Sequence, residues 1–181
     1  VVQNVWSQYI VIMIIVVMGV SGSGKTTVGK PLANALGFPF YDADDFHPQE
    51  NIEKMKQGIP LQDLDREPWL ENLTNNLTQW EAGVGAVLAC SALKETHRTF
   101  LQSGVANDIS WVCLSGPPEL IKERLIERKG HPFKPGGVNL QLWIESQFVN
   151  LELPKYGWHF NISAPVGHIV QGILDKLEHI N

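Results

Sequence analysis

A glycine-rich segment near the N-terminus carries the clearest chemical signal in this sequence. Residues 19–26 read GVSGSGKT, which fits the phosphate-binding pattern G-x-x-x-x-G-K-[ST]. Glycines let backbone N–H groups converge on phosphate oxygens, because no Cβ blocks their approach. Lys25 is then placed to reach the β- and γ-phosphates, and Thr26 to ligate Mg²⁺. The pattern predicts a nucleoside triphosphate site made by Gly19, Val20, Ser21, Gly22, Ser23, Gly24, Lys25, Thr26 and Thr27.

The elements on either side favour this interpretation over a glycine-rich turn with an incidental lysine. The run before it, residues 9–20, is almost wholly apolar and rich in β-branched residues. It is shorter than the roughly 20 residues of a membrane span, and the basic region and cleavage site of a signal peptide are missing. It therefore predicts a strand buried on both faces. A helical stretch follows the glycines and points its positive N-terminal end at the phosphates.

Strand-like and helical stretches alternate along the chain, which predicts an α/β fold: one domain, residues 1–181, with a five-stranded parallel sheet flanked by helices. The expected strands cover residues 9–18, 38–42, 84–90, 109–115 and 158–162. The expected helices cover residues 24–36, 49–57, 67–82, 94–103, 117–129, 139–151 and 165–179.

Charge and cysteine content exclude some partners and indicate a compartment. The chain has 14 basic and 19 acidic residues, a formal net charge of −5. An acidic chain is a poor default nucleic-acid binder, because phosphate backbones demand clustered positive charge, so nucleic acid is not expected as a partner. A membrane is not expected either, because the apolar run at residues 9–20 is too short to span one. The two cysteines, Cys90 and Cys113, lie in apolar strand-like runs, which suits the reducing cytoplasm better than a disulfide scaffold.

Two carboxylates follow the second predicted strand, where open α/β sheets bind ligands. Asp42 and Asp44 lie in the run YDADDFHP. Either could accept a hydroxyl proton while the other holds Mg²⁺. The alternative is an acidic loop that caps the next helix.

The segment that follows resembles a known family. Residues 47–70 read HPQENIEKMKQGIPLQDLDREPWL, and residues 90–94 read CSALK with Arg98 downstream. These motifs, and the later run from Arg124 to Glu152, resemble the gluconokinases, and the resemblance extends over about residues 12–154. Residues 47–70 are specific enough to separate this family from shikimate and adenylate kinases.

The resemblance implies a P-loop kinase of the nucleoside- and shikimate-kinase-like fold with a lid. It implies transfer of phosphate from ATP to D-gluconate with Mg²⁺, and, as in many members, a homodimer. The acceptor-binding segment is expected at about residues 43–83 and the lid at about residues 129–145. A kinase for another small polyol acid, or a nucleotide-binding protein with an impaired lid, are the alternatives.

Gluconate needs cations for its carboxylate and polar groups for its hydroxyls. Arg66, Lys94 and Arg98 could supply the charge, and Asp44 is the candidate general base. Taken singly, Arg66 could instead cap a helix and Lys94 with Arg98 could be a solvated face. The expected acceptor-site residues are Asp44, His47, Lys54, Arg66, Ser91, Lys94, Arg98, His131 and Gln147.

Arg124 and Arg128 lie four residues apart, so one helix face presents both. A basic lid closing over the phosphates would stabilise the transferred group, which makes both arginines catalytic candidates beside Lys25 and Asp44. A salt-bridged helix with Glu123 and Glu127 is the alternative.

The sequence departs from the family pattern in three places. Pro132 stands where an aromatic residue is usual, and residues 135–145 form a longer stretch than expected. No aspartate ends the strand at 84–90, where Ser91 follows, so Mg²⁺ is assigned to Thr26, Asp42 and the phosphates.

Overall fold

The chain forms a twisted parallel sheet, seen in a computed structural model that describes residues 12–57, 59, 61–127 and 140–179, with the backbone alone at 140–143. The five strands are β1 (Ile14–Met18), β2 (Phe40–Asp42), β3 (Ala86–Ala89), β4 (Ser110–Ser115) and β5 (Trp158–Asn161). Their order is β2-β3-β1-β4-β5, and every neighbouring pair is parallel. The predicted five-stranded parallel sheet is confirmed, and residues 9–11 of the first expected strand lie outside the described residues.

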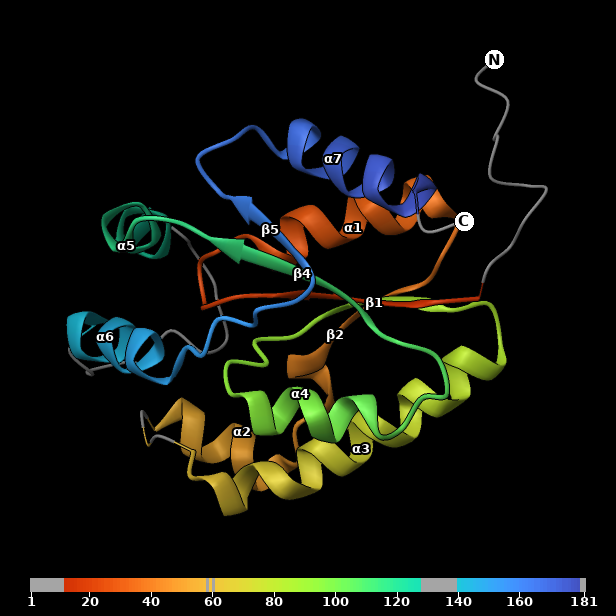
Figure 1. The fold of residues 1–181 in the computed structure, drawn as a ribbon. Helices are drawn as coiled ribbons and strands as arrows, with labels where there is room; N and C mark the ends of the chain where they lie inside the picture. Colours follow the sequence, from red (N-terminus) through yellow and green to blue (C-terminus); the bar gives the residue numbers. More distant parts are fainter. Residues whose placement is uncertain (1–11, 58, 60, 128–139, 180–181) are drawn as a thin grey trace.

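Helices cover both faces of this sheet (Figure 1). Helices α1 and α7 lie on one face, and α3 and α4 lie on the other. Their bounds are α1 (Lys25–Leu36), α2 (Gln49–Lys56), α3 (Asp63–Ala82), α4 (Glu95–Gln102), α5 (Pro118–Glu127), α6 (Leu140–Asn150) and α7 (Val166–Glu178), with a short 3₁₀ helix η2 (Ala43–Phe46).

Helix α3 begins four residues earlier than the sequence predicts. Gln62 caps its first turn, and the Gln62 backbone N–H donates to the Asp65 carboxylate at 2.9 Å. Such a capping box satisfies N–H groups that a helix start leaves unpaired. As a result, Asp65 and Arg66 belong to the first turn of a helix and have fixed positions.

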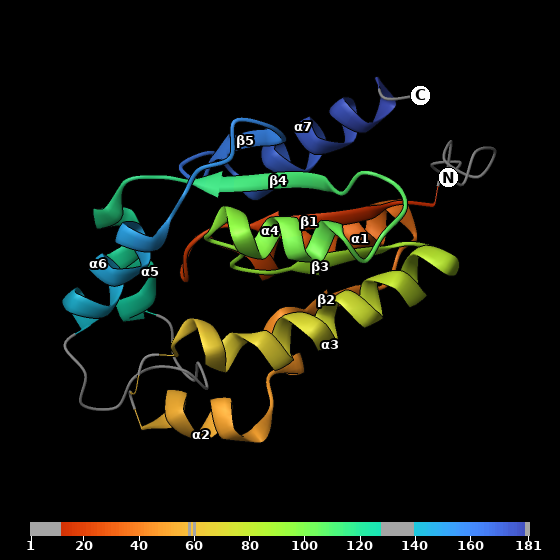
Figure 2. The same ribbon diagram turned by 60° about the horizontal axis from the view of Figure 1, so that its bottom comes forward.

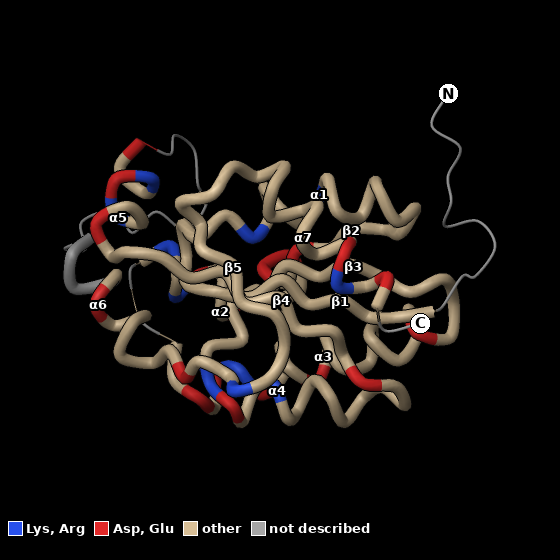
Figure 3. The backbone as a smooth tube through the Cα atoms, turned by 45° about the horizontal axis from the view of Figure 1, so that its top comes forward, with Lys and Arg blue, Asp and Glu red and all other residues tan. Residues whose placement is uncertain are grey.

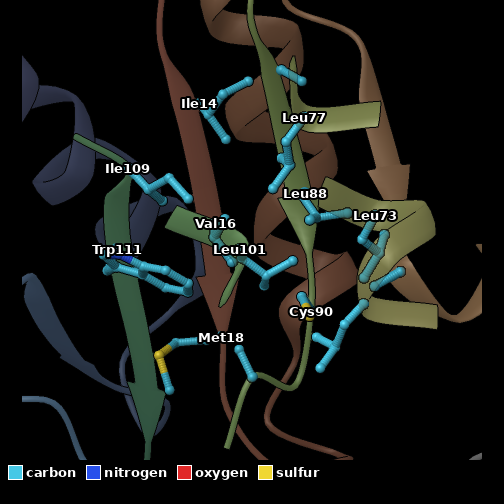
Figure 4. Close-up of a cluster of buried hydrophobic side chains, with 14 of the residues drawn as sticks. Ile14, Val16, Met18, Leu73, Leu77, Leu88, Cys90, Leu101, Ile109 and Trp111 are labelled. Carbon is cyan, nitrogen blue, oxygen red and sulfur yellow. The ribbon is translucent and has the colours of Figure 1, made fainter. Parts of the chain in front are cut away.

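Strand β1 separates two hydrophobic clusters, because successive side chains of a strand point to opposite faces. Ile14, Val16 and Met18 face the cluster under α3 and α4, which Figure 4 shows in close-up. Ile15 and Val17 face the cluster under α1 and α7. All five side chains are buried, which explains why the strand reads as one continuous apolar run.

All five strands end at the same edge of the sheet because they are parallel. In Figure 2 the arrowhead of β4 points toward the end of the fold where α5, α6 and the first turns of α3 lie. The glycine-rich segment leaves this edge after β1, η2 after β2, and the CSALK segment after β3. Open α/β sheets bind their ligands at this edge. Among the residues described, no helix is long and apolar enough to cross a membrane.

Candidate active site

The glycine-rich segment, residues 19–26, folds as a loop between β1 and the start of α1. Gly24 caps α1 with φ 91°, a left-handed conformation that favours glycine. A Cβ at Gly22 would lie 2.8 Å from Leu125 Cγ, so α5 leaves no space for a side chain. The Lys25 ammonium donates to the carbonyl oxygens of Gly19 at 3.0 Å and Val20 at 3.1 Å. Lys25 is therefore held within the loop, where it is predicted to bind the phosphates of the nucleotide.

Ser23 gives an independent indication that this loop is shaped for a ligand. Its side chain is 1% exposed, and its Oγ is one of two buried side-chain polar atoms without a hydrogen-bond partner in the part of the chain that the structure describes. A buried hydroxyl without a partner is costly unless a ligand or water satisfies it. The residues of the loop thus fit a bound phosphate chain.

Arg124 reaches this loop from α5. Its Nη2 donates to the carbonyl of Ile162 at 2.8 Å, and its Nη1 lies 3.8 Å from the position of a Cβ on Gly24. The guanidinium therefore lies beside the N-terminal end of α1, within reach of bound phosphates. This position favours the catalytic interpretation of Arg124 over a surface salt bridge within α5. Arg128, its predicted companion, lies outside the described residues.

Gln147 contacts the phosphate-binding loop, although the sequence predicts it to bind the acceptor. Its Oε1 accepts from the Ser21 N–H at 2.7 Å, and its Nε2 donates to the Ser21 Oγ at 3.2 Å. Helix α6 is thus connected to the nucleotide side of the site. The two residues are 126 positions apart, so no local pattern could indicate the pair.

Two predicted Mg²⁺ ligands lie together between α1 and β2. The Thr26 hydroxyl donates to Asp42 Oδ2 at 3.0 Å, while Asp42 Oδ1 accepts from the Asp44 N–H at 3.2 Å. Mg²⁺ prefers hard oxygen ligands and usually keeps several waters, so one hydroxyl, one carboxylate and the phosphates form a suitable donor set. This pairing separates the two carboxylates: Asp42 faces the predicted metal ligand Thr26, while Asp44 is exposed at the start of η2.

Three of these charged residues, Lys25, Asp42 and Asp44, lie near Cys90 at the end of β3. The pKa of the Cys90 thiol is raised to about 12, mainly by burial, which a hydrogen bond to the Ala92 backbone partly opposes. Of the charged groups nearby, Asp44 and Asp42 raise this pKa and Lys25 lowers it. The three charged side chains therefore lie around the end of β3. Both cysteines are free thiols and buried, as the sequence predicts.

A second group of charges, called the acceptor cluster here, comprises Arg66, Lys94 and Asp63. The Lys94 ammonium lies 2.9 Å from both carboxylate oxygens of Asp63, and the Arg66 guanidinium lies 3.8 Å from one of them. The hydrogen bond from Lys94 is the main cause that lowers the pKa of Asp63. Figure 3 shows basic and acidic residues interspersed near α4. The cluster shows that two cations from separate segments can converge on one carboxylate.

His47 lies next to this cluster as a neutral ring. It stacks on Trp69 with ring centroids 4.6 Å apart, and its Nδ1 lies 3.4 Å from the amide nitrogen of Asn51. Burial and the nearby Arg66 lower the pKa of His47 to about 4. The ring is therefore uncharged at neutral pH and suited to hydrogen bonds with hydroxyl groups.

Lys54 is engaged within the protein. Its ammonium forms a 2.6 Å ion pair with Asp65, and Asn51 donates to the Asp65 carbonyl at 2.7 Å. These contacts fasten α2 to the first turn of α3. Lys54 thus stabilises the first turn of α3, which carries Asp63 and Arg66 of the acceptor cluster. Its predicted contact with the acceptor stays a prediction.

Arg98 requires a correction. The sequence predicts that it binds the substrate carboxylate, but its side chain is 1% exposed. All of its nitrogens donate within the protein, to acceptors on Ala92, Leu93, Glu95, Glu152 and Tyr156. A substrate would have to displace several of these bonds, so Arg98 does not belong to the binding surface.

Two predicted acceptor-site residues remain, Ser91 and His131. Ser91 follows β3 at the same edge as Asp44, while His131 lies outside the described residues. Sequence reasoning missed Asp63, which pairs with Lys94 across 31 positions, and His97, a buried side chain. Burial, Arg66 and Lys94 lower the pKa of His97, so it lies beside the acceptor cluster.

Comparisons with known proteins identify the family. A "Probable gluconokinase" of Xenopus tropicalis is 44% identical over 92% of both chains. The solved structure of a gluconokinase from Sinorhizobium meliloti has a TM-score of 0.80 and 37% identity over 93% of both chains. This chain belongs to the gluconokinase family.

Shikimate kinases share the fold with the gluconokinases. A family model described as shikimate kinase matches residues 21–150. The structure of shikimate kinase from Aquifex aeolicus has a TM-score of 0.63 but only 24% identity over 92% of this chain and 96% of that one. At that identity the likeness extends to the fold alone. Gluconokinases and shikimate kinases thus share an ATP-using architecture, and the substrate must be argued from the acceptor side.

Proposed function

We propose that the protein transfers the γ-phosphoryl group of ATP to the primary hydroxyl of D-gluconate, giving 6-phospho-D-gluconate and ADP. Membership of the gluconokinase family over most of the chain supports this reaction. The observation that carries it within the site is the acceptor cluster, where Lys94 and Arg66 converge on the Asp63 carboxylate. A gluconate carboxylate offers the same chemistry to the same cations.

Each group at the site has a role in this reaction. Asp44 accepts the proton of the attacking gluconate hydroxyl. The oxygen of that hydroxyl forms a bond to the γ-phosphorus, and the bond from this phosphorus to the bridging β–γ oxygen breaks, which releases ADP. Lys25 and Arg124 stabilise the charge on the phosphoryl oxygens. Neutral His47 hydrogen-bonds a gluconate hydroxyl. Gln147 holds the Ser21 end of the phosphate-binding loop.

Thr26 and Asp42 would hold Mg²⁺, which neutralises phosphate charge when bound. The proposal also includes a lid at residues 129–145, with Arg128 and His131, and a homodimer. The acceptor-binding segment is residues 43–83. The two buried free thiols support a cytoplasmic location.

A coupled assay of ADP release tests the proposal across four acceptor classes: D-gluconate, shikimate, glycerate and nucleoside monophosphates. We expect turnover with gluconate and little with the others. Turnover with another acceptor and none with gluconate would overturn the assignment. ATP binding by calorimetry without turnover on any acceptor would indicate a nucleotide-binding protein instead.

A further inference from the structure

The segment after β3 contains an unusual backbone conformation. Among the residues that the structure describes, Ala92 is the only non-glycine residue with a positive φ, at 40°. Left-handed backbone is unfavourable for an L-residue, so surrounding contacts must stabilise it. Ala92 is fully buried, and two residues later the same segment presents Lys94 to the acceptor cluster.

Arg98 is the residue that holds this turn. Its Nη1 donates to the Ala92 carbonyl at 2.7 Å and to the Leu93 carbonyl at 3.1 Å. Its Nη2 donates to the Glu152 carbonyl at 2.6 Å and to the Glu95 carboxylate at 2.6 Å. One buried guanidinium thus satisfies two successive carbonyls of the turn and joins them to the first turn of α4 and to the segment after α6.

The contacts around Arg98 form a closed network. The Glu152 N–H donates to the Leu93 carbonyl at 2.9 Å, and the Glu152 carboxylate accepts from the Glu95 N–H at 2.6 Å. Tyr156 donates to Glu95 at 2.7 Å. The residues after α6 are therefore bonded to the segment that carries Lys94, while Gln147 on α6 contacts the phosphate-binding loop.

We infer that Arg98 is a positioning residue for acceptor binding: it holds Ala92 in the left-handed conformation and thereby places Lys94 to bind the acceptor carboxylate. The inference rests on the proposed function for the identity of the acceptor. Arg98 itself touches neither substrate. Its effect on the reaction passes through the turn at Ala92.

The test compares Arg98→Met and Arg98→Lys with Tyr156→Phe. Arg98→Met should raise KM for gluconate by about tenfold or more while KM for ATP stays within about twofold. Arg98→Lys keeps the charge but replaces the planar fork of five N–H donors by a single ammonium group, so it should lie in between. Tyr156→Phe removes two network bonds, one from Arg98 and one to Glu95, but spares the carbonyls of Ala92 and Leu93, and should remain near wild type.

Ala92→Gly tests whether the turn is the link. Glycine adopts a positive φ without strain, so combining Ala92→Gly with Arg98→Met should recover several-fold of the lost gluconate affinity. Independent, multiplicative effects of the two substitutions would overturn the inference. So would equal changes in both KM values, or a lower melting temperature with unchanged kinetics.

Amide hydrogen exchange separates this inference from the proposed function. The N–H groups of Glu95 and Glu152 report on the network without any substrate. Arg98→Lys should speed their exchange by about tenfold or more, while amides of β1 stay protected. If the wild-type chain does not phosphorylate gluconate, the proposed function fails, and these amides still decide the role of Arg98. Unchanged exchange at both amides in Arg98→Lys, or in Arg98→Met if it folds, would overturn it.

Discussion

The phosphate-binding loop and the acceptor cluster lie at the same edge of the sheet, but the chain builds them in different ways. The loop is one continuous segment, residues 19–26, whose backbone N–H groups and one lysine do the binding. The acceptor cluster joins Asp63 and Arg66 on α3 to Lys94 in the segment after β3. The loop depends on backbone geometry, whereas the cluster depends on charges that long-range folding brings together. Substitutions should therefore affect the two regions through different kinetic constants.

Removing the loop's lysine should have the largest effect. Lys25→Met should lower kcat by about 10³-fold, because the ammonium stabilises charge on the phosphoryl oxygens in the transition state. Circular dichroism should show an unchanged fold. A variant that folds and turns over within tenfold of wild type would contradict the assignment of the loop as the phosphoryl-transfer site.

Asp44→Asn should have the next largest effect. It should lower kcat by about 10²-fold, near the low end for general-base catalysis, because phosphoryl transfer asks little of its base. ATP binding by calorimetry should stay close to wild type, since Asp42 rather than Asp44 pairs with Thr26. Unchanged turnover would remove Asp44 as the base.

Removing a charge from the acceptor cluster should weaken the binding of the acceptor and leave the binding of ATP unchanged. Lys94→Met should raise KM for gluconate by about tenfold or more, the value of one hydrogen bond to a charged group, without changing KM for ATP. Lys30→Met is the matched control, because Lys30 is an exposed lysine on α1 that lies over the Phe40 ring. Equal changes in both KM values for Lys94→Met would show that the two regions are not separable.

The smallest expected effect concerns His47 and pH. Its pKa is about 4 in the folded chain and 6.5 ordinarily, so below pH 6.5 the unfolded state binds a proton that the folded state does not. The contribution of neutral His47 to the free energy of unfolding is fully present above pH 6.5 and is lost as the pH falls toward 4. Urea unfolding should show wild type losing about 1 kcal/mol more than His47→Gln between pH 7.5 and about 5.5. Parallel losses in the two proteins would place the His47 pKa near its ordinary value.

The fold could be predicted from the sequence because its signals are local. Continuous apolar runs mark strands buried on both faces, and helical stretches between them force parallel pairing. The boundary error at α3 came from the capping box of Gln62 and Asp65, whose residues look like an ordinary polar loop. The phosphate-binding loop could also be predicted from the sequence, because all of its residues are contiguous.

The acceptor side was only partly predictable, because charge and spacing do not reveal burial. Arg98 and Lys94 are both basic residues of one short segment, yet Lys94 reaches Asp63 and Arg98 is buried among carbonyls. The positive φ of Ala92, which explains why a buried arginine is present, has no sequence signal in an alanine. Gln147 was assigned to the acceptor and contacts Ser21 instead.

The central claim is that the acceptor side selects its substrate by charge, and a comparison of two acceptors tests it most directly. D-Gluconate and D-glucitol share their chain of hydroxyls, but glucitol has no carboxylate. The account predicts that kcat/KM for ADP release is at least about 10²-fold higher with gluconate, because glucitol has no carboxylate with which to bind Lys94 and Arg66. Equal kcat/KM values for the two acceptors would contradict it.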